Sequence, residues 1–160
     1  MEPFIHFPAQ GLVVCSECKH AVLPSHVDAH LKDGGKHTAA KADRERIIQA
    51  VQAIQGLQST IAELNHLVFP PASTPPIPTL QQPRKDGLKC QLQDEYGNRC
   101  QYIACQVRKI QEHCRVVHQW ENPRERGRPE VGKLVQVLWR TGVHCQHFFV
   151  RGPGAQFFEV

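Results

Sequence analysis

Apolar residues recur every three to four positions between residues 42 and 68, the pattern of a helix with one buried face. Their spacing averages about 3.5 residues, close to the heptad repeat of a coiled coil. We therefore expect a long amphipathic helix over residues 42–68. It either packs on the rest of the protein or binds a second copy or a protein partner through its apolar seam. The seam consists of Ile47, Val51, Ile54, Leu57, Ile61, Leu64 and Val68.

A proline-rich segment follows this helix. Residues 69–83 contain six of the twelve prolines, and a helix cannot continue through them because proline lacks the backbone N–H and clashes with the preceding turn. Such a composition favours an extended, semi-rigid linker. We expect this linker to occupy residues 69–85 and to divide the chain.

Short elements are predicted on both sides of the linker. Ser25 precedes a short helix that should end at the glycine pair 34–35, with Ser25 as its N-cap. Further helices are predicted from Tyr102 to His118 and from Val131 to Trp139. Two aromatic and β-branched runs joined by R-G-P-G predict a β-hairpin at the end of the sequence.

Two cysteines and two histidines near the N-terminus form a first candidate metal site. The cysteines have the C-x2-C spacing of a zinc knuckle, and eleven residues separate the second cysteine from the first histidine. Val27, three residues before that histidine, stands where zinc fingers bury an aliphatic side chain. The gap between the histidines is a little long, which leaves His26 and His20 as alternative fourth ligands. The predicted set is Cys15, Cys18, His30 and His37.

A second set follows the linker. Twelve residues separate its second cysteine from its first histidine, and four separate the two histidines, as in two-Cys/two-His fingers. The nine residues between its cysteines predict an inserted loop, for which Asp94 and the Gly97–Asn98 pair supply turn residues. Cys105 is the alternative ligand. The predicted set is Cys90, Cys100, His113 and His118.

Both sets have the donor types and number of a closed structural zinc site, so we expect two Zn²⁺ ions. Neither region has enough apolar residues to fold by burial alone, and small domains of this kind commonly need a metal. The start of the sequence lacks the features of a signal peptide, which favours a reducing compartment and free thiols over disulfides among the seven cysteines. No apolar run is long enough to cross a membrane, and no membrane partner is expected.

Basic residues are concentrated in the second half of the chain. Residues 81–160 carry 13 Lys and Arg against 8 Asp and Glu, whereas residues 1–80 carry 6 against 7. A polyanion should therefore bind the C-terminal half. We expect nucleic acid, DNA in preference to RNA, to contact the predicted finger helix and the basic loops. The candidate contact residues are Arg99, Arg108, Lys109, Arg115, Arg124, Arg126 and Arg128.

The motifs of the common zinc enzymes are missing from this sequence. It has neither the H-E-x-x-H of zincins nor the H-x-E and P-C-x-x-C pieces of zinc deaminases. We therefore expect a binding protein and not an enzyme, in the nucleus if it binds DNA and otherwise in the cytoplasm. A zinc-stabilised protein-interaction module is the alternative.

Several motifs together resemble the fungal OrsD-like family, named for a protein encoded in an orsellinic acid biosynthesis cluster. They include C-S-E-C-K-H-A-V-L-P, H-V-D-A-H-L, P-P-I-P-T-L, C-Q-Y-I-A-C, I-Q-E-H-C-R-V-V-H-Q-W-E-N-P and W-R-T-G-V-H-C-Q-H-F-F. The resemblance covers nearly the whole chain. It implies an N-terminal module with two zinc-finger-like elements, often attached to longer chains, some of them from mobile-element-type genes. Transferred motif by motif, it implies the same eight metal ligands, whereas His147 stands where the family pattern has arginine.

These observations predict a small α+β, zinc-finger-type fold with two zinc-nucleated modules and a C-terminal hairpin. We expect the modules to be joined by the long helix and the linker. The expected divisions are 1–41 for the first module, 42–68 for the helix, 69–85 for the linker, 86–120 for the second module and 121–160 for a helix and the hairpin. Because the sequence ends directly after an apolar run, we also expect it to continue in a longer parent chain.

Overall fold

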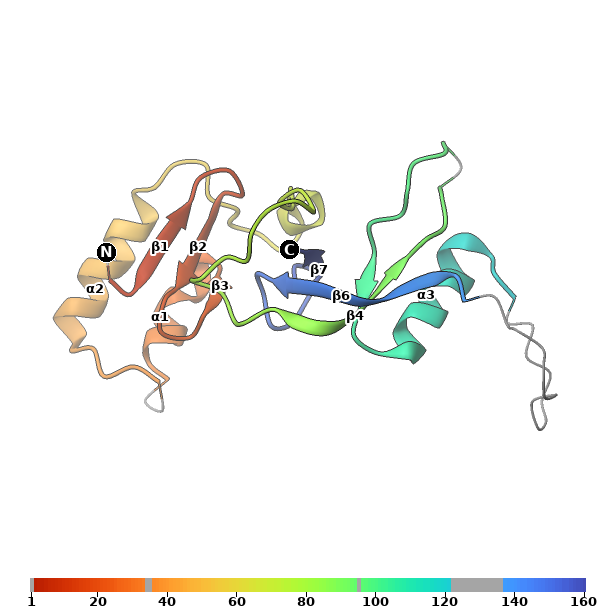
Figure 1. The fold of residues 1–160 in the computed structure, drawn as a ribbon. Coiled ribbons are helices and arrows are strands. Elements are labelled where there is room, and N and C mark those ends of the chain that lie inside the picture. The colour runs from red at the N-terminus through yellow and green to blue at the C-terminus, as the bar shows by residue number, and fades with distance from the viewer. Residues whose placement is uncertain (1, 34–35, 95, 122–136) are drawn as a thin grey trace.

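The computed structural model describes residues 2–33, 36–94, 96–121 and 137–160. It is a small α+β structure with two antiparallel sheets, and its described part contains three α-helices and two short 3-10 helices. Figure 1 shows an elongated arrangement in which the β1–β3 sheet with α1 and α2 lies at one end and α3 lies at the other. The predicted α+β class is therefore confirmed. In the described part, no helix has both the length and the apolar character needed to cross a membrane.

The first sheet is a three-stranded meander of order β1-β2-β3. All four residues of β2 are buried, since this central strand packs on both faces. One face meets α1 through Val27 and Leu31 and meets α2 through Ile47 and Val51, two residues of the predicted apolar seam. The elements are β1 (Phe4–Phe7), β2 (Leu12–Cys15), β3 (His20–Val22), the 3-10 helix η1 (Pro24–His26), α1 (Val27–Leu31) and α2 (Lys41–Gln52).

The helix predicted over residues 42–68 is wrong in its extent, because α2 ends at Gln52. Gly56 then adopts a φ of 76°, a left-handed conformation that a helix cannot contain. A second signal follows in T-x-x-E: Thr60 Oγ1 accepts a hydrogen bond from Glu63 N (3.3 Å), and Glu63 Oε2 accepts one from Thr60 N (3.1 Å). This capping box starts a new short 3-10 helix, η2 (Glu63–His66), in a different direction.

The short helix before the glycine pair 34–35 forms, but Ser25 does not cap it. Pro24 opens η1, and neither η1 nor α1 has a side-chain cap hydrogen bond. The buried Val27 and Leu31 instead fix α1 by packing against β2 and α2.

The proline-rich segment is not a uniformly extended linker, because it contains two hydrogen-bonded turns, from Thr74 N to Pro71 O (2.9 Å) and from Leu80 N to Ile77 O (3.1 Å), and it packs against the second half of the chain. Buried Gln146 binds its backbone through three hydrogen bonds, accepting from Ile77 N (2.8 Å) and donating to Ile77 O (3.1 Å) and Gln81 O (2.7 Å). Leu80 is buried in the same cluster as Phe148 and Phe158. The segment therefore contributes to the core instead of only spacing two modules.

The second sheet has the order β5-β4-β6-β7. β6 and β7 pair antiparallel, as the hairpin pattern predicts, but β6 begins at Trp139, where the sequence predicted the end of a helix. Glu159 of β7 accepts from Lys89 of β4 (2.9 Å) and also from Arg140 of β6, which ties three strands together. The elements are β4 (Arg84–Cys90), β5 (Ile103–Ala104), α3 (Val107–His118), β6 (Trp139–His147) and β7 (Phe157–Glu159). Residues 131–136 of the predicted helix lie outside the described residues.

One hydrophobic cluster spans the two halves of the chain. Phe148, which is fully buried, packs with Phe7, Phe69 and Phe158 from three different segments. The buried members of this cluster come from β2, β3, the segment after α2, the proline-rich segment and the C-terminal hairpin. They are Leu12, Val14, Ala21, Leu23, Leu64, Leu67, Leu80, Phe148, Phe149 and Phe158.

Candidate metal centres

Four predicted ligands meet at the end of the first sheet, and we call this group the first centre. His37 Nε2 lies 3.0 Å from His30 Nε2, 3.3 Å from Cys18 Sγ and 3.8 Å from Cys15 Sγ. Zinc bonds of about 2.3 Å to sulfur and 2.0–2.1 Å to nitrogen place neighbouring atoms of a tetrahedron about 3.3–3.8 Å apart. The four ligand atoms all lie within 4.8 Å of one another, so this group could hold a metal ion.

The turn between β2 and β3 determines the positions of the two thiols of the first centre. Cys15 is the last residue of β2, and Lys19 reverses the chain with a φ of 56° and donates from its backbone N–H to Cys15 O (2.7 Å). Inside the turn, Cys18 N donates to Cys15 Sγ at 3.4 Å. The turn therefore brings the Cys15 and Cys18 sulfur atoms within 4.8 Å of each other.

The two imidazoles of the first centre come from α1 and from the segment after it. His30 lies on α1 one turn after Val27, which is fully buried as the finger pattern predicts. His37 N donates to Asp33 O (3.0 Å), and the His37 side chain is only 3% exposed. His37 Nδ1 lies 2.7 Å from Glu17 Oε2, a contact that the ligand pattern alone did not identify.

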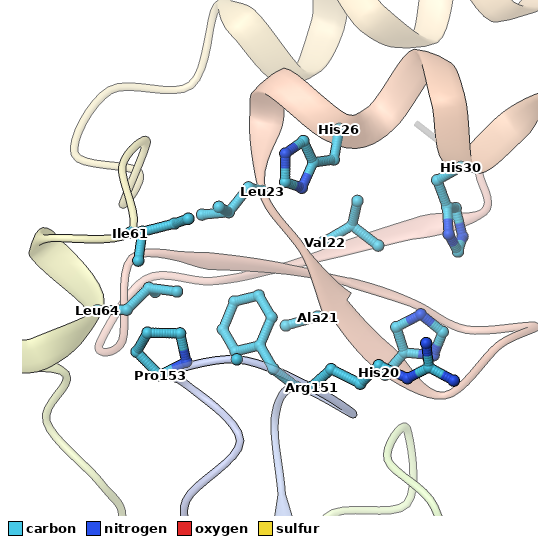
Figure 2. A pocket seen from close by; sticks show the side chains of 12 residues that line it. His20, Ala21, Val22, Leu23, His26, His30, Ile61, Leu64, Arg151 and Pro153 are labelled. Carbon is cyan, nitrogen blue, oxygen red and sulfur yellow. The ribbon is translucent and has the colours of Figure 1, made fainter.

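The alternative ligands His20 and His26 are not part of this group. His20 Nδ1 donates to Cys18 O (3.0 Å), and the His20 ring lies edge-on to the His30 ring with 5.4 Å between the centroids. His20 and His26 instead line a pocket of about 450 Å³ together with His30 and Arg151, and Figure 2 shows these side chains around it. The described geometry thus groups His37, and neither alternative, with the cysteines.

Burial sets the protonation of the first centre. It lowers the pKa of His30 to about 4, with a further contribution from the neighbouring His37, so the imidazole is neutral at pH 7 and its lone pair is available. Burial and the adjacent Cys15 raise the pKa of Cys18 to about 11. A metal ion must therefore displace a proton from this thiol, and binding should release protons.

The second predicted set also converges, and we call it the second centre. Cys100 Sγ lies 3.2 Å from His113 Nε2, and the ligand atoms of Cys90, Cys100, His113 and His118 all lie within 4.8 Å of one another. Cys90 ends β4, and both histidines lie on α3. The donor types match those of the first centre, and the ligand atoms of both groups lie within the same 4.8 Å of one another.

The insertion between Cys90 and Cys100 forms a small hairpin, as its turn residues predict. Asp94 Oδ1 accepts from Asn98 N (2.8 Å) and Tyr96 N (2.9 Å), and Gly97 has a φ of 80°. The hairpin returns the chain so that Cys100 N donates to Leu92 O (2.9 Å). The long gap between the cysteines is therefore compatible with one compact site.

The second centre is packed between one aromatic ring and a narrow apolar strip of α3. Tyr102 stacks on His113 with 3.9 Å between the ring centroids and 10° between the planes. Ile110 and Cys114 are fully buried against β4 and β5. Burial, followed by the nearby His118, lowers the pKa of His113 to about 4, so this ligand is neutral at pH 7.

One buried nitrogen of the second centre lacks a hydrogen-bond partner. His118 Nε2 is buried and has no hydrogen-bond partner among the described residues. A buried polar atom without a partner is costly, and a metal ion at this position would provide one. This orphaned nitrogen supports the fit of the group to a cation.

The remaining cysteines lie outside both centres. Cys105, the alternative ligand, faces Cys145 with 3.8 Å between the sulfur atoms. Cys114 is a buried helix residue beside Cys90, and burial raises its pKa. All seven cysteines are free thiols.

The predicted nucleic-acid contacts are placed only in part. Arg108, Lys109 and Arg115 lie exposed on α3, and Arg99 lies exposed at the base of the inserted hairpin. Arg124, Arg126 and Arg128 fall outside the described residues. Gln106 at the start of α3 and Glu112 within it are also exposed polar residues, which the pattern of basic residues alone did not single out.

Comparison with known proteins identifies the family. A family model described as orsellinic acid/F9775 biosynthesis cluster protein D, OrsD, matches residues 2–119. The chain belongs to the OrsD family. The matched range includes all eight residues of the two centres, so both are part of the region that defines this OrsD-family segment.

A curated relative gives the scale of the match. Orsellinic acid/F9775 biosynthesis cluster protein D of Emericella nidulans is 24% identical over 150 residues, which is 94% of this chain. The OrsD-family chain spans only 24% of that relative's length. No solved structure matches the chain.

Proposed function

We propose that this OrsD-family chain is a zinc-organised nucleic-acid-binding segment that holds one Zn²⁺ in each centre. Cysteine and histidine donors in sets of four are typical of structural zinc sites. Four protein ligands leave no open position for a substrate or a reactive water, which supports a structural and non-catalytic role. When bound, zinc would join the chain segments that carry its four ligands, which a small hydrophobic core alone holds together only weakly.

The outer face of α3 carries the proposal for nucleic acid. Its inner residues, Ile110 and Cys114, are fully buried, whereas Arg108, Lys109 and Arg115 are exposed. Neither Arg108 nor Arg115 has an ion-pair partner among the described residues. Unpaired cations on one helix face are suited to bind phosphate and base edges.

The start of α3 sets which side chains would face the bases. In two-Cys/two-His fingers, the residue before the helix and the third and sixth helical residues contact successive bases in the major groove. With α3 beginning at Val107, these positions are Gln106, Lys109 and Glu112, and all three are exposed. Glutamine pairs with adenine, lysine with guanine and glutamate with cytosine. The three residues would supply chemically distinct contacts to duplex DNA once the exposed ion pair of Lys109 with Glu112 (3.2 Å) opens. Arg108, Arg115 and Arg99 would then bind phosphates.

A salt series with substituted proteins tests this proposal. Lys109→Ala should weaken binding to a mixed-sequence DNA duplex roughly tenfold or more, whereas Arg115→Ala should weaken binding to all sequences and reduce the salt slope by about 1. Lys41→Ala is the matched control, since Lys41 is an exposed cation on α2. Equal effects of the three substitutions, or no measurable affinity at low salt, would contradict a contact through α3. Nuclear localisation forms part of the same proposal.

A protein-interaction role is the second candidate. Ile61 and Val68 are 56% and 68% exposed, so part of the apolar seam is not covered by this chain. Light scattering of the purified protein, with and without DNA, separates the two candidates. Concentration-dependent dimers that disappear in an Ile61→Ser variant, together with no DNA affinity, would favour the second.

A further inference from the structure

Glu17 lies between the two cysteines of the first centre and contacts one of its histidines. Glu17 Oε2 is 2.7 Å from His37 Nδ1, while Nε2 of the same ring faces the three other ligand atoms at 3.0–3.8 Å. The two nitrogens of His37 therefore point in opposite directions, one to a carboxylate and the other to the centre. The C-x2-C pattern itself gives Glu17 no role, because it counts Glu17 only as one of the two residues between the cysteines.

The chemistry of the contact fixes the tautomer of His37. An ionised carboxylate can only accept hydrogen bonds, so Nδ1 must carry the proton and donate it to Glu17. In the neutral ring, Nε2 then keeps its lone pair, and this is the form of histidine that binds a metal. Carboxylates that hold a ligand histidine in this way also raise its basicity and fix its orientation.

We propose that Glu17 is a positioning residue for metal binding at the first centre. It holds His37 in the Nδ1–H tautomer with Nε2 directed at the metal position. The inference rests on the proposed zinc binding of Cys15, Cys18, His30 and His37. It adds a residue that is not itself a ligand and that selects His37 over the other histidines nearby.

The local backbone explains why this glutamate is in place. The turn that brings the Cys15 and Cys18 sulfurs together is closed by the Lys19 N–H to Cys15 O bond, and Glu17 is part of that turn. His37 is fixed from the other side by its N–H to Asp33 O. The geometry that arranges the thiols therefore also arranges the carboxylate. By contrast, His20 donates its Nδ1–H to a backbone carbonyl and is not part of the ligand group.

The second centre provides an internal control. Within the described residues, no carboxylate lies at hydrogen-bond or ion-pair distance from the ring of His113 or His118, although the charge of Asp94 acts on His118 from further away, and His113 is held by stacking on Tyr102 instead. Substitution of Glu17 should therefore change one centre and spare the other in the same molecule. A general loss of folding would change both.

The experiment is a zinc competition titration of the full chain with a chromophoric chelator, for wild type, Glu17→Ala, Glu17→Gln and the control Glu45→Ala. Loss of such a carboxylate typically lowers metal affinity 10–100-fold. Because the Glu17 side chain is 57% exposed and water competes for the contact, we expect about tenfold for Glu17→Ala at the first centre. Glu17→Gln should lose less, since its amide oxygen still accepts from Nδ1. The second centre and Glu45→Ala should be unchanged.

Histidine ¹⁵N spectra of the zinc-loaded proteins give a readout that a general structural defect would not move. With zinc on Nε2, we expect His37 to carry its proton on Nδ1 in every variant, with a hydrogen-bonded Nδ1–H signal in wild type and in Glu17→Gln that shifts to that of a water-exposed Nδ1–H in Glu17→Ala. Unchanged first-centre affinity and unchanged His37 signals in Glu17→Ala would overturn the role of Glu17 while leaving zinc binding intact. Failure of wild type to bind zinc at this centre would instead overturn the proposed function on which the inference rests.

Discussion

The two centres have the same donor set but very different surroundings. The first is backed by eight buried residues from β1, β2, β3, α1 and α2, seven of them aliphatic or aromatic and the eighth the ligand Cys15. The second is backed by five, of which two are cysteines and one is alanine. Burial of apolar area is the main favourable contribution to folding. The first centre therefore lies on a region with its own core, whereas we expect α3 at the second centre to depend more strongly on a bound metal.

Removal of one ligand from each centre should expose this difference, with the largest effect expected for Cys100→Ala. Structural zinc contributes about 10–16 kcal/mol of apparent folding free energy in small fingers, and α3 has little other packing. We expect Cys100→Ala to lose one zinc and the amide protection of α3, measured by hydrogen exchange. Cys15→Ala should lose one zinc but keep protection in β2 and α2. Retention of α3 protection in Cys100→Ala would contradict the assigned asymmetry.

The shared cluster around Phe148 tests whether the two regions are separate folding units. Phe148 is fully buried and contacts Phe7 of β1, Phe69 and Phe158. Truncation of such a residue costs about 3–5 kcal/mol. We expect Phe148→Ala to lower the denaturant midpoints of both the β1–β3 sheet and the β4–β7 sheet. Two transitions, of which only one is shifted, would show that the halves fold independently.

Acidification of the metal-free protein should act on both centres within the same pH window. Burial lowers the pKa of His30 and of His113 to about 4, from an ordinary value of about 6.5. The fold therefore favours the neutral rings, so this stability is present above pH 6.5 and is lost as the pH falls toward 4. We expect circular dichroism to report loss of α3 at a higher pH than loss of the first sheet, because α3 has the smaller core. The reverse order would contradict the comparison.

The smallest effect is expected at the turn after α2. Gly56 has a φ of 76°, with nothing within 4 Å of where a Cβ would lie. The expected cost of Gly56→Ala is therefore conformational only, about 1–2 kcal/mol. Thermal unfolding should register this loss without a change in zinc content. A gain in stability would indicate that the helix extends through residue 56 after all.

Both ligand groups follow from sequence spacing, since the cysteine and histidine intervals determine which side chains can reach one point. The buried Val27 and Ile110, each three residues before a ligand histidine, also follow from that spacing. Sequence spacing alone could not decide whether His37, His20 or His26 is the fourth ligand. That choice depends on the positions in which the turn and α1 hold the three rings.

The errors arose where local signals competed. The apolar period through residue 68 predicted one helix, but Gly56 and the Thr60–Glu63 capping box end it and start another. The proline-rich segment was expected to be a spacer, yet Leu80 and the contacts of Gln146 bind it to the core. Pairing of β4 with β6 joins residues far apart in the sequence, such as Cys90 with Trp139, and Trp139 becomes a strand residue only through that pairing.

The most direct test of two metal centres is native mass spectrometry of the purified chain with its bound metal. The account predicts two Zn²⁺ per chain in wild type and one in each of Cys15→Ala and Cys100→Ala. Wild-type protein that remains folded without bound zinc when zinc is supplied would contradict it.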